Sequence, residues 1–197
     1  QPYRRADGAP SLEFTFAIPL DTDEFAKHPS GNPFVYSGRF DMLGTMHGVP
    51  VIKDDKTTRA FTQNWAESFS LRSQFIGYVW ACQSLGIDVD TVVVRGVAIQ
   101  KTQIKLQEAV KTYSRALVTR WLAQLARDTH AIRKAWDTGV WDYNLAESCT
   151  AYGGCQFVEL CEASDPRPWY ANYEVRRWSP LNRDPRETVA SGAPIGT

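Results

Sequence analysis

Residues 37–58, SGRFDMLGTMHGVPVIKDDKTT, have the pattern of a β-hairpin that carries acids and a lysine. Ile52, Asp54 and Lys56 alternate along the second arm. They therefore share one face of a strand, in which side chains repeat every two residues. The pair His47-Gly48 suits a two-residue turn, because glycine accepts the positive φ that such turns require. The segment predicts two antiparallel strands joined at this turn.

The two acids of the hairpin create a conflict that a metal ion would remove. A register symmetric about the turn places Asp41 directly opposite Asp54, and like charges at that spacing destabilise a sheet. Mg²⁺ or Mn²⁺ bound by both carboxylates would offset the repulsion. Lys56 would then lie beside the metal, able to orient a water or neutralise charge on a phosphate. The alternative is a surface hairpin whose charges are only solvated.

The motifs G-R-F-D ending at Asp41, D-D-K-T containing Asp54 and Lys56, and then Gln74 and Tyr78 occur in this order. The chain resembles, through this ordered set, the RecB-like branch of the PD-(D/E)XK nuclease superfamily. The resemblance implies an α/β fold with a restriction-endonuclease-like core, in which helices flank a central mixed β-sheet. It makes Asp41 and Asp54 metal ligands, Lys56 the catalytic lysine, and Gln74 and Tyr78 a supporting pair.

A third metal ligand is suggested by the strand expected at residues 11–20. Apolar residues alternate there, and Glu13 faces away from the apolar row. In the resembled nucleases an acid on the strand before the hairpin often completes the metal site, which makes Glu13 the candidate. A solvent-facing strand glutamate is the alternative.

The segments after the hairpin predict two helices around a buried strand. Residues 65–85 have a helical pattern that places Gln74 and Tyr78 on one face. The resemblance lays this face over the site, with Gln74 reaching toward a metal-bound water or phosphate; a core helix with a buried amide is the alternative. Residues 90–100 are a β-branched run typical of a buried strand. Residues 102–138 have apolar spacings of three, four and seven, which predict one long helix.

A second metal centre is indicated by SCTAYGGCQFVELC, in which Cys149, Cys155 and Cys161 are evenly spaced. Thiolates that converge from a short glycine-containing segment are typical of a metal clamp. The cluster resembles the cysteines of AddB-type and CRISPR-associated exonucleases, which implies a 4Fe-4S iron-sulfur cluster, while the spacing leaves Zn²⁺ open. The fourth ligand is unidentified because mid-helix Cys82 has the context of a small buried hydrophobe. Three free cysteines are the alternative.

Composition favours a globular protein without indicating its partner. The 197 residues are 43% hydrophobic and 22% charged with zero formal net charge, so any DNA-binding surface must come from local clusters. The candidates for such a cluster are Arg59, Arg72, Lys101 and Lys105. We expect one nuclease domain over residues 1–184, which lacks the family's N-terminal helices and includes the cysteine cluster at 145–163. A loose tail is expected at residues 185–197.

No apolar run reaches the roughly 20 residues needed to span a bilayer, and no signal peptide is visible. These features predict a cytoplasmic protein without membrane contact, in a bacterial or phage-infected cell.

The function expected from these features is that of a Mg²⁺- or Mn²⁺-dependent DNA nuclease. The resemblance favours a phage-encoded exonuclease that processes DNA ends in recombination or repair, with DNA as substrate and a recombination or replication protein as a further partner. One alternative is a non-catalytic DNA-binding or assembly subunit with a nuclease fold. Another is a zinc-clamped interaction module in which the hairpin acids are incidental.

Overall fold

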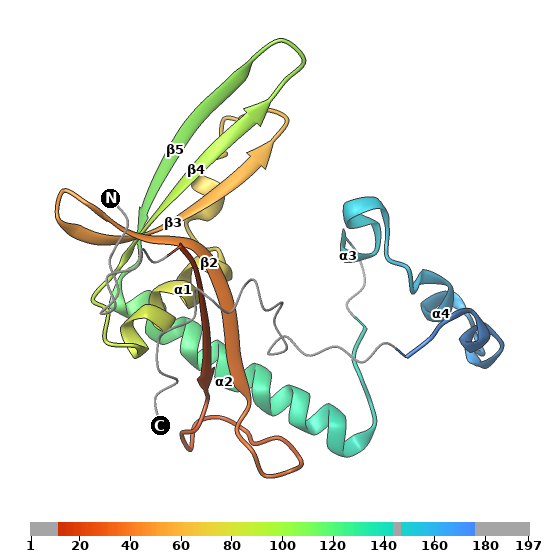
Figure 1. Cartoon of the computed structure of the whole chain (residues 1–197). Coiled ribbons are helices and arrows are strands. Elements are labelled where there is room, and N and C mark those ends of the chain that lie inside the picture. The colour runs from red at the N-terminus through yellow and green to blue at the C-terminus, as the bar shows by residue number, and fades with distance from the viewer. Residues whose placement is uncertain (1–11, 144–146, 176–197) are drawn as a thin grey trace.

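The computed structural model describes residues 12–143 and 147–175, and its centre is a twisted five-stranded sheet (Figure 1). Neighbouring strands follow the chain in the order β1-β2-β3-β4-β5. Pairing is parallel between β3 and β4 and antiparallel elsewhere, so the sheet is mixed. The strands are β1 Leu12–Pro19, β2 Val35–Met46, β3 Val49–Thr58, β4 Thr91–Ile99 and β5 Ile104–Thr112.

Two helices cover one face of this sheet. Helix α1, Ser73–Ser84, links β3 to β4, and helix α2, Arg115–Thr138, packs along α1. Trp121 of α2 reaches the start of β2, where its ring contacts Tyr36 at a centroid distance of 5.2 Å. Gly77 permits this close packing, because a Cβ there would collide with the Tyr36 hydroxyl. The core lies between sheet and helices, and the predicted α/β class with a mixed sheet is confirmed.

The hairpin is formed as predicted over its outer half. Its turn residues His47 and Gly48 have φ values of 52° and 82°. The pairs run from Met46 opposite Val49 to Met42 opposite Lys53, which is the predicted register. Beyond Met42, β2 continues in its pairing with β1 while β3 continues with β4. The expected pair of Asp41 opposite Asp54 is therefore absent from the β2–β3 ladder, and the two strands separate at a fork.

The helix predicted over residues 65–85 is wrong in its first part. A 3-10 turn, η1 Glu67–Phe69, comes first, and α1 begins only at Ser73 because Arg72 is extended, with ψ of 116°. The carbonyl of Phe69 accepts a 2.6 Å hydrogen bond from the buried Tyr113 hydroxyl. This long-range bond ties the turn to the residue that follows β5.

The long helix predicted over residues 102–138 is also wrong in its first third, which is strand β5. Ile104, Leu106 and Val110 fit a period of two as well as helical spacings, and pairing along the whole of β4 selects the strand. The helix starts after Ser114, whose side chain accepts a hydrogen bond from the Leu117 N–H. It ends at Gly139, which has a φ of 69°.

The described part of the C-terminal segment consists of short helical turns that lie apart from the sheet in Figure 1. They are α3 Glu147–Thr150, η2 Ala151–Gly153, α4 Val158–Glu162 and η3 Arg167–Asn172. The predicted loose tail at 185–197 falls outside the described residues. Across residues 12–143 and 147–175, the structure contains no helix with the length and apolarity to cross a membrane.

Candidate active site

Asp54 is an acid buried beneath helix α1. It lies on β3 beside Val94 of β4 and is only 2% exposed. Its Oδ2 atom lies 2.5 Å from the ammonium of Lys56, which is its ionic and hydrogen-bonding partner. Burial raises the pKa of Asp54, nearby Asp41 adds to the rise, and Lys56 opposes it. Burying a carboxylate is costly even beside a cation, and such positions are typical of functional sites.

Lys56 lies on the same face of β3 as Asp54, as the alternation predicted. Its side chain is 31% exposed, so its charged end is neither fully buried nor free in solvent. The ammonium lies 5.7 Å from the centre of the Phe75 ring, which belongs to the first turn of α1. A cation over an aromatic face gains electrostatic stabilisation. Lys56 is thus held near Asp54 by contacts from both β3 and α1.

Asp41 bridges the fork between β2 and β3. Its Oδ2 accepts a hydrogen bond of 2.7 Å from the backbone N–H of Asp55. This bond links the two strands just beyond Met42 and Lys53, the last residue pair of their ladder. The charge of Asp41 is close enough to Asp54 to contribute to the raised pKa of that acid. The structure thus brings Asp41, Asp54 and Lys56 together, with Asp41 held by the main chain of β3.

Gln74 and Tyr78 form a hydrogen-bonded chain from α1 to β2. The Gln74 side-chain amide donates to the Tyr78 hydroxyl at 2.8 Å, and this hydroxyl donates to the carbonyl of Arg39 at 2.6 Å. Arg39 lies two residues before Asp41 on β2. The amide nitrogen of Gln74 is therefore directed at Tyr78, whereas the sequence suggested that it reaches toward a water or phosphate. The pair anchors β2 to α1 next to the fork.

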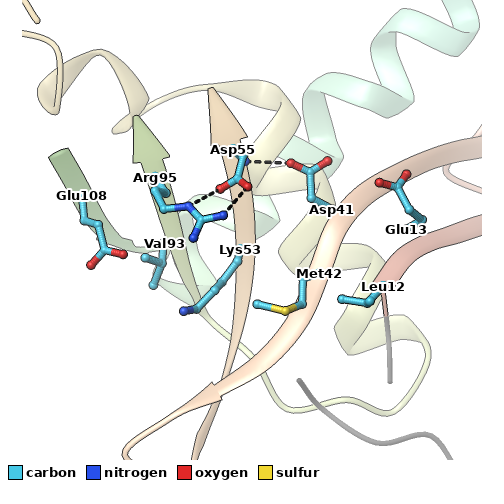
Figure 2. Close-up of a pocket in the computed structure, with 9 residues that line it drawn as sticks. All are labelled: Leu12, Glu13, Asp41, Met42, Lys53, Asp55, Val93, Arg95 and Glu108. Carbon is cyan, nitrogen blue, oxygen red and sulfur yellow. Dashed lines mark hydrogen bonds and ion pairs between the residues drawn. The ribbon is translucent and has the colours of Figure 1, made fainter. Parts of the chain in front are cut away.

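Glu13 lies on β1 and contacts Arg39 rather than the two aspartates. Its Oε2 is 3.1 Å from Nε of Arg39, and its side chain is 55% exposed. Its φ of 48° is unusual for a residue other than glycine and departs from regular strand geometry. Glu13 nevertheless lines the same cavity as Asp41, and Figure 2 shows both carboxylates directed toward the same side of the sheet.

A divalent cation fits the donor chemistry of the fork. Asp41 and Asp54 supply carboxylate oxygens, which are ligands that Mg²⁺ and Mn²⁺ prefer, and Mg²⁺ is commonly held by only one or two carboxylates. The buried carboxylate of Asp54 lies beside Lys56 and close to Asp41. Within the described ranges, no three His, Cys, Asp or Glu side chains gather closely enough to hold a metal. Glu13 therefore does not complete a three-acid group with Asp41 and Asp54 in this structure.

The three cysteines lie in the C-terminal segment. Cys149 is on α3, Cys155 follows η2, and Cys161 is on α4. The backbone N–H of Cys155 donates to the carbonyl of Cys149 at 2.8 Å, which closes a tight turn through Gly153-Gly154. Cys161 is exposed on α4. The side chains of the three do not converge as a metal-binding group in the part of the chain that the structure describes. Cys82 is fully buried in α1, and burial raises the pKa of its thiol to about 12.

On the other side of β3, a cavity of about 470 Å³ opens on the face of the sheet that the helices leave uncovered (Figure 2). Asp55 there accepts two hydrogen bonds from Arg95, at 2.9 Å from Nε and 2.6 Å from Nη2. Val93 forms part of its lining, together with Lys53 and Glu108. Asp54 and Asp55 are neighbours on β3, and each forms an ion pair on its own face of the sheet. Asp54 pairs with Lys56 on the covered face, and Asp55 pairs with Arg95 on the uncovered face.

The sequence did not predict three groups of the site, which are the Arg39 carbonyl, the Asp55 N–H and the ring of Phe75. The first two are main-chain groups, so no residue type signals them. Phe75 lies next to Gln74 in the sequence, and the helical pattern marks it only as apolar.

Comparison with known proteins assigns no family to the chain. No protein-family model matches it, and no curated protein does. Among solved structures, it is similar to one titled "Crystal structure of SSO0001", at 16% sequence identity and a TM-score of 0.43. The similarity covers 77% of this chain and 59% of that protein, so the chain spans less than two thirds of its length.

Proposed function

We propose that this protein is a Mg²⁺- or Mn²⁺-dependent DNA nuclease whose active site is the fork between β2 and β3. The observation that carries the proposal is the buried carboxylate of Asp54, whose Oδ2 lies beside the ammonium of Lys56 and which is close to a second acid, Asp41. A protein that needed only a stable strand would gain by placing an apolar residue here. The ordered motifs in the sequence support the same function.

Each residue of the fork has a separate task in this proposal. Asp41 and Asp54 would hold the cation, which when bound lowers the pKa of a water and offsets charge on the phosphate. Lys56 would place its ammonium beside the phosphodiester and stabilise the negative charge that develops there. Gln74 and Tyr78 keep the strand that carries Asp41 in place, through the hydrogen bond to Arg39.

In this proposal, exposed basic residues outside the fork would contact the DNA backbone. Arg59 follows β3 directly, and its carbonyl accepts a weak 3.4 Å hydrogen bond from Gln100 in the β4–β5 turn, beside Lys101. Arg72 precedes α1 and stacks on the Phe69 ring at 5.3 Å. Contacts of this kind bind phosphates without reading sequence. They favour a substrate recognised by its backbone, as processing of DNA ends requires.

The test is cleavage of end-labelled single- and double-stranded DNA with Mg²⁺ or Mn²⁺. Asp54→Ala and Lys56→Ala remove the two buried-face residues, and we expect both to abolish cleavage. Asp55→Ala and Lys53→Ala are matched controls, because they make the same changes on the opposite face of the same strand. We expect these controls to retain cleavage, because both side chains lie on the uncovered face and the backbone N–H of Asp55 that holds Asp41 is unchanged.

Two results would contradict the proposal. One is the absence of cleavage by the unaltered protein when it is shown to be folded and supplied with metal, which favours the DNA-binding or assembly role. The other is equal loss in variants of both faces, because the fork would then have no special part in the reaction.

We further propose that Cys149, Cys155 and Cys161 hold a 4Fe-4S cluster or Zn²⁺ in the cell. The grouping of three thiols in a short segment supports this, and iron, sulfide and zinc analysis of protein purified without oxygen tests it. Stoichiometric zinc with no Mg²⁺ or Mn²⁺ affinity at the fork would instead favour an interaction module.

A further inference from the structure

The β4–β5 hairpin has an exposed apolar face on the side of the sheet away from the helices. Ile99, Ile104 and Leu106 are 59%, 68% and 69% exposed there. Ile99 lies opposite Ile104 in the ladder, and Val97 lies opposite Leu106. Figure 1 shows β4 and β5 extending together away from α1 and α2. No described helix packs on this face, and apolar side chains that cluster in this way indicate an interaction site.

Four cross-strand pairs make up this face, which we name the hairpin face. From the tip inward they are Ile99–Ile104, Val97–Leu106, Arg95–Glu108 and Val93–Val110; Val93 is only 1% exposed, so Val110, at 49%, is the accessible member of the last pair. Three pairs are apolar, and the remaining pair consists of opposite charges. Every residue of β4 on this face is therefore chemically complementary to its own partner on β5.

This pairing has a consequence for two copies of the chain. A two-fold axis parallel to the strands, midway between β4 and β5, brings β4 of one copy over β5 of the other. Each β4 residue of one copy then lies over the β5 residue of the second copy that corresponds to its own cross-strand partner. Apolar side chains therefore face apolar side chains, and Arg95 faces Glu108 of the second copy. Face-to-face sheets pack about 10 Å apart with nearly aligned strands, which this axis permits. We propose that the hairpin face is the interface of a homodimer, independently of the nuclease function.

Arg95 can serve this interface without leaving its present partner. Its Nε and Nη2 atoms donate to Asp55, while a guanidinium has five N–H donors. Nη1 takes no part in the two hydrogen bonds to Asp55 and can donate to a second carboxylate. Two symmetric charge pairs would fix the register of the dimer, because sliding along the strands brings Arg95 over an apolar residue.

The size of the face sets the expected strength of association. Strands of this length span about 30 Å, and two strands are about 10 Å wide, so the buried area is below the roughly 800 Å² per partner of a standard interface. We therefore expect a dimer that dissociates on dilution.

Sedimentation velocity of the whole chain over a wide concentration range tests the proposal. We expect the mass of the unaltered protein to rise from monomer toward dimer with concentration. Leu106→Glu should raise the dimer dissociation constant by at least about tenfold, because a charge replaces a buried apolar side chain. Val49→Glu is the matched control, since Val49 is an apolar strand residue of similar exposure, 56%, outside the hairpin face, and it should leave association unchanged.

A second pair of variants tests the register. Glu108→Lys places a cation over Arg95 of the second copy and should weaken the dimer, whereas the opposite charge change Lys105→Glu lies on the other face of β5 and should not. A monomer at every concentration, or a dimer that Leu106→Glu leaves intact, overturns the proposal. A monomer that Leu106→Glu strongly destabilises also overturns it, because the face would then be covered by the chain itself.

Discussion

The two faces of strand β3 carry the same pair of residue types in different environments. On the helix-covered face, Asp54 is 2% exposed and has Lys56 as its ionic partner. On the uncovered face, the Asp55 side chain is 46% exposed and receives two well-formed hydrogen bonds from Arg95. Both carboxylate oxygens of Asp55 accept hydrogen bonds from Arg95 while the side chain stays partly in solvent, whereas Asp54 is buried with Lys56 as the partner of its Oδ2.

This difference separates a structural ion pair from a candidate reactive one. An exposed pair contributes roughly 0–1 kcal/mol to stability and requires no further explanation. Burial of an acid carries a desolvation cost that the nearby lysine offsets only in part, so its presence points to a function that needs it. Substitutions matched across the two faces can therefore break or strengthen the assignment of the site.

The largest expected difference is in metal affinity. Asp54→Asn keeps the shape of the side chain but removes its charge, and we expect Mn²⁺ binding to weaken on the order of 100-fold or more. Asp55→Asn keeps the backbone N–H that holds Asp41, so its affinity should stay within about threefold of the unaltered protein. Titration of Mn²⁺ followed by electron paramagnetic resonance measures both. Equal affinities in the two variants would remove Asp54 from the metal site.

A smaller effect is expected from the hydroxyl of Tyr78. Tyr78→Phe removes its hydrogen bond to Arg39 and should cost about 1 kcal/mol of unfolding free energy. It should also slow cleavage by roughly tenfold, because Asp41 follows Arg39 closely on β2. Tyr113→Phe is the matched control, since the Tyr113 hydroxyl makes an equivalent 2.6 Å bond to the Phe69 carbonyl away from the fork.

Comparison of these two tyrosine variants shows whether the Tyr78 hydroxyl positions Asp41 for cleavage or only stabilises the fold. Both variants should lose similar stability in urea titrations, but only Tyr78→Phe should lose activity. If both slow cleavage equally, the hydroxyl of Tyr78 has a purely structural role.

Local signals predicted the turn of the hairpin and the shared face of Asp54 and Lys56, whereas the fork depends on long-range contacts. The turn at His47-Gly48 and the alternation through Asp54 and Lys56 depend on neighbouring residues alone, so they were readable in the sequence. The separation of β2 from β3 depends on β1 and β4 as partners, which no local pattern specifies. The burial of Asp54 likewise depends on α1, more than fifteen residues later in the chain.

The wrongly predicted helix shows the same limit. Residues 104–112 satisfy both a helical and a strand period, and only the availability of β4 as a partner selects the strand. Ser114 was the useful signal, because a serine cap marks where the helix begins. The even-numbered apolar residues of β5 then become an exposed face instead of a helix core.

The pH dependence of stability should also differ between the faces. Burial raises the pKa of Asp54 above its unfolded value, so this acid contributes stability at low pH that is lost as the pH rises through the folded pKa. At neutral pH, Asp54→Asn should therefore raise the unfolding free energy, by about 1 kcal/mol. The gain should shrink as the pH falls through the raised pKa, because protonated Asp54 is neutral too. Chemical denaturation at several pH values measures this, and a loss of stability at neutral pH would contradict it.

The smallest effect is expected on the uncovered face. Arg95→Ala removes both hydrogen bonds to Asp55, yet we expect at most about 0.5–1 kcal/mol of lost stability, because water replaces the guanidinium at an exposed carboxylate. The loss should decline further in high salt, since screening weakens exposed pairs. Thermal unfolding at low and high salt, at a concentration where the protein is monomeric, measures the effect. A larger loss, insensitive to salt, would mean that Arg95 supports the fork through Asp55, and the two faces of β3 would then act together.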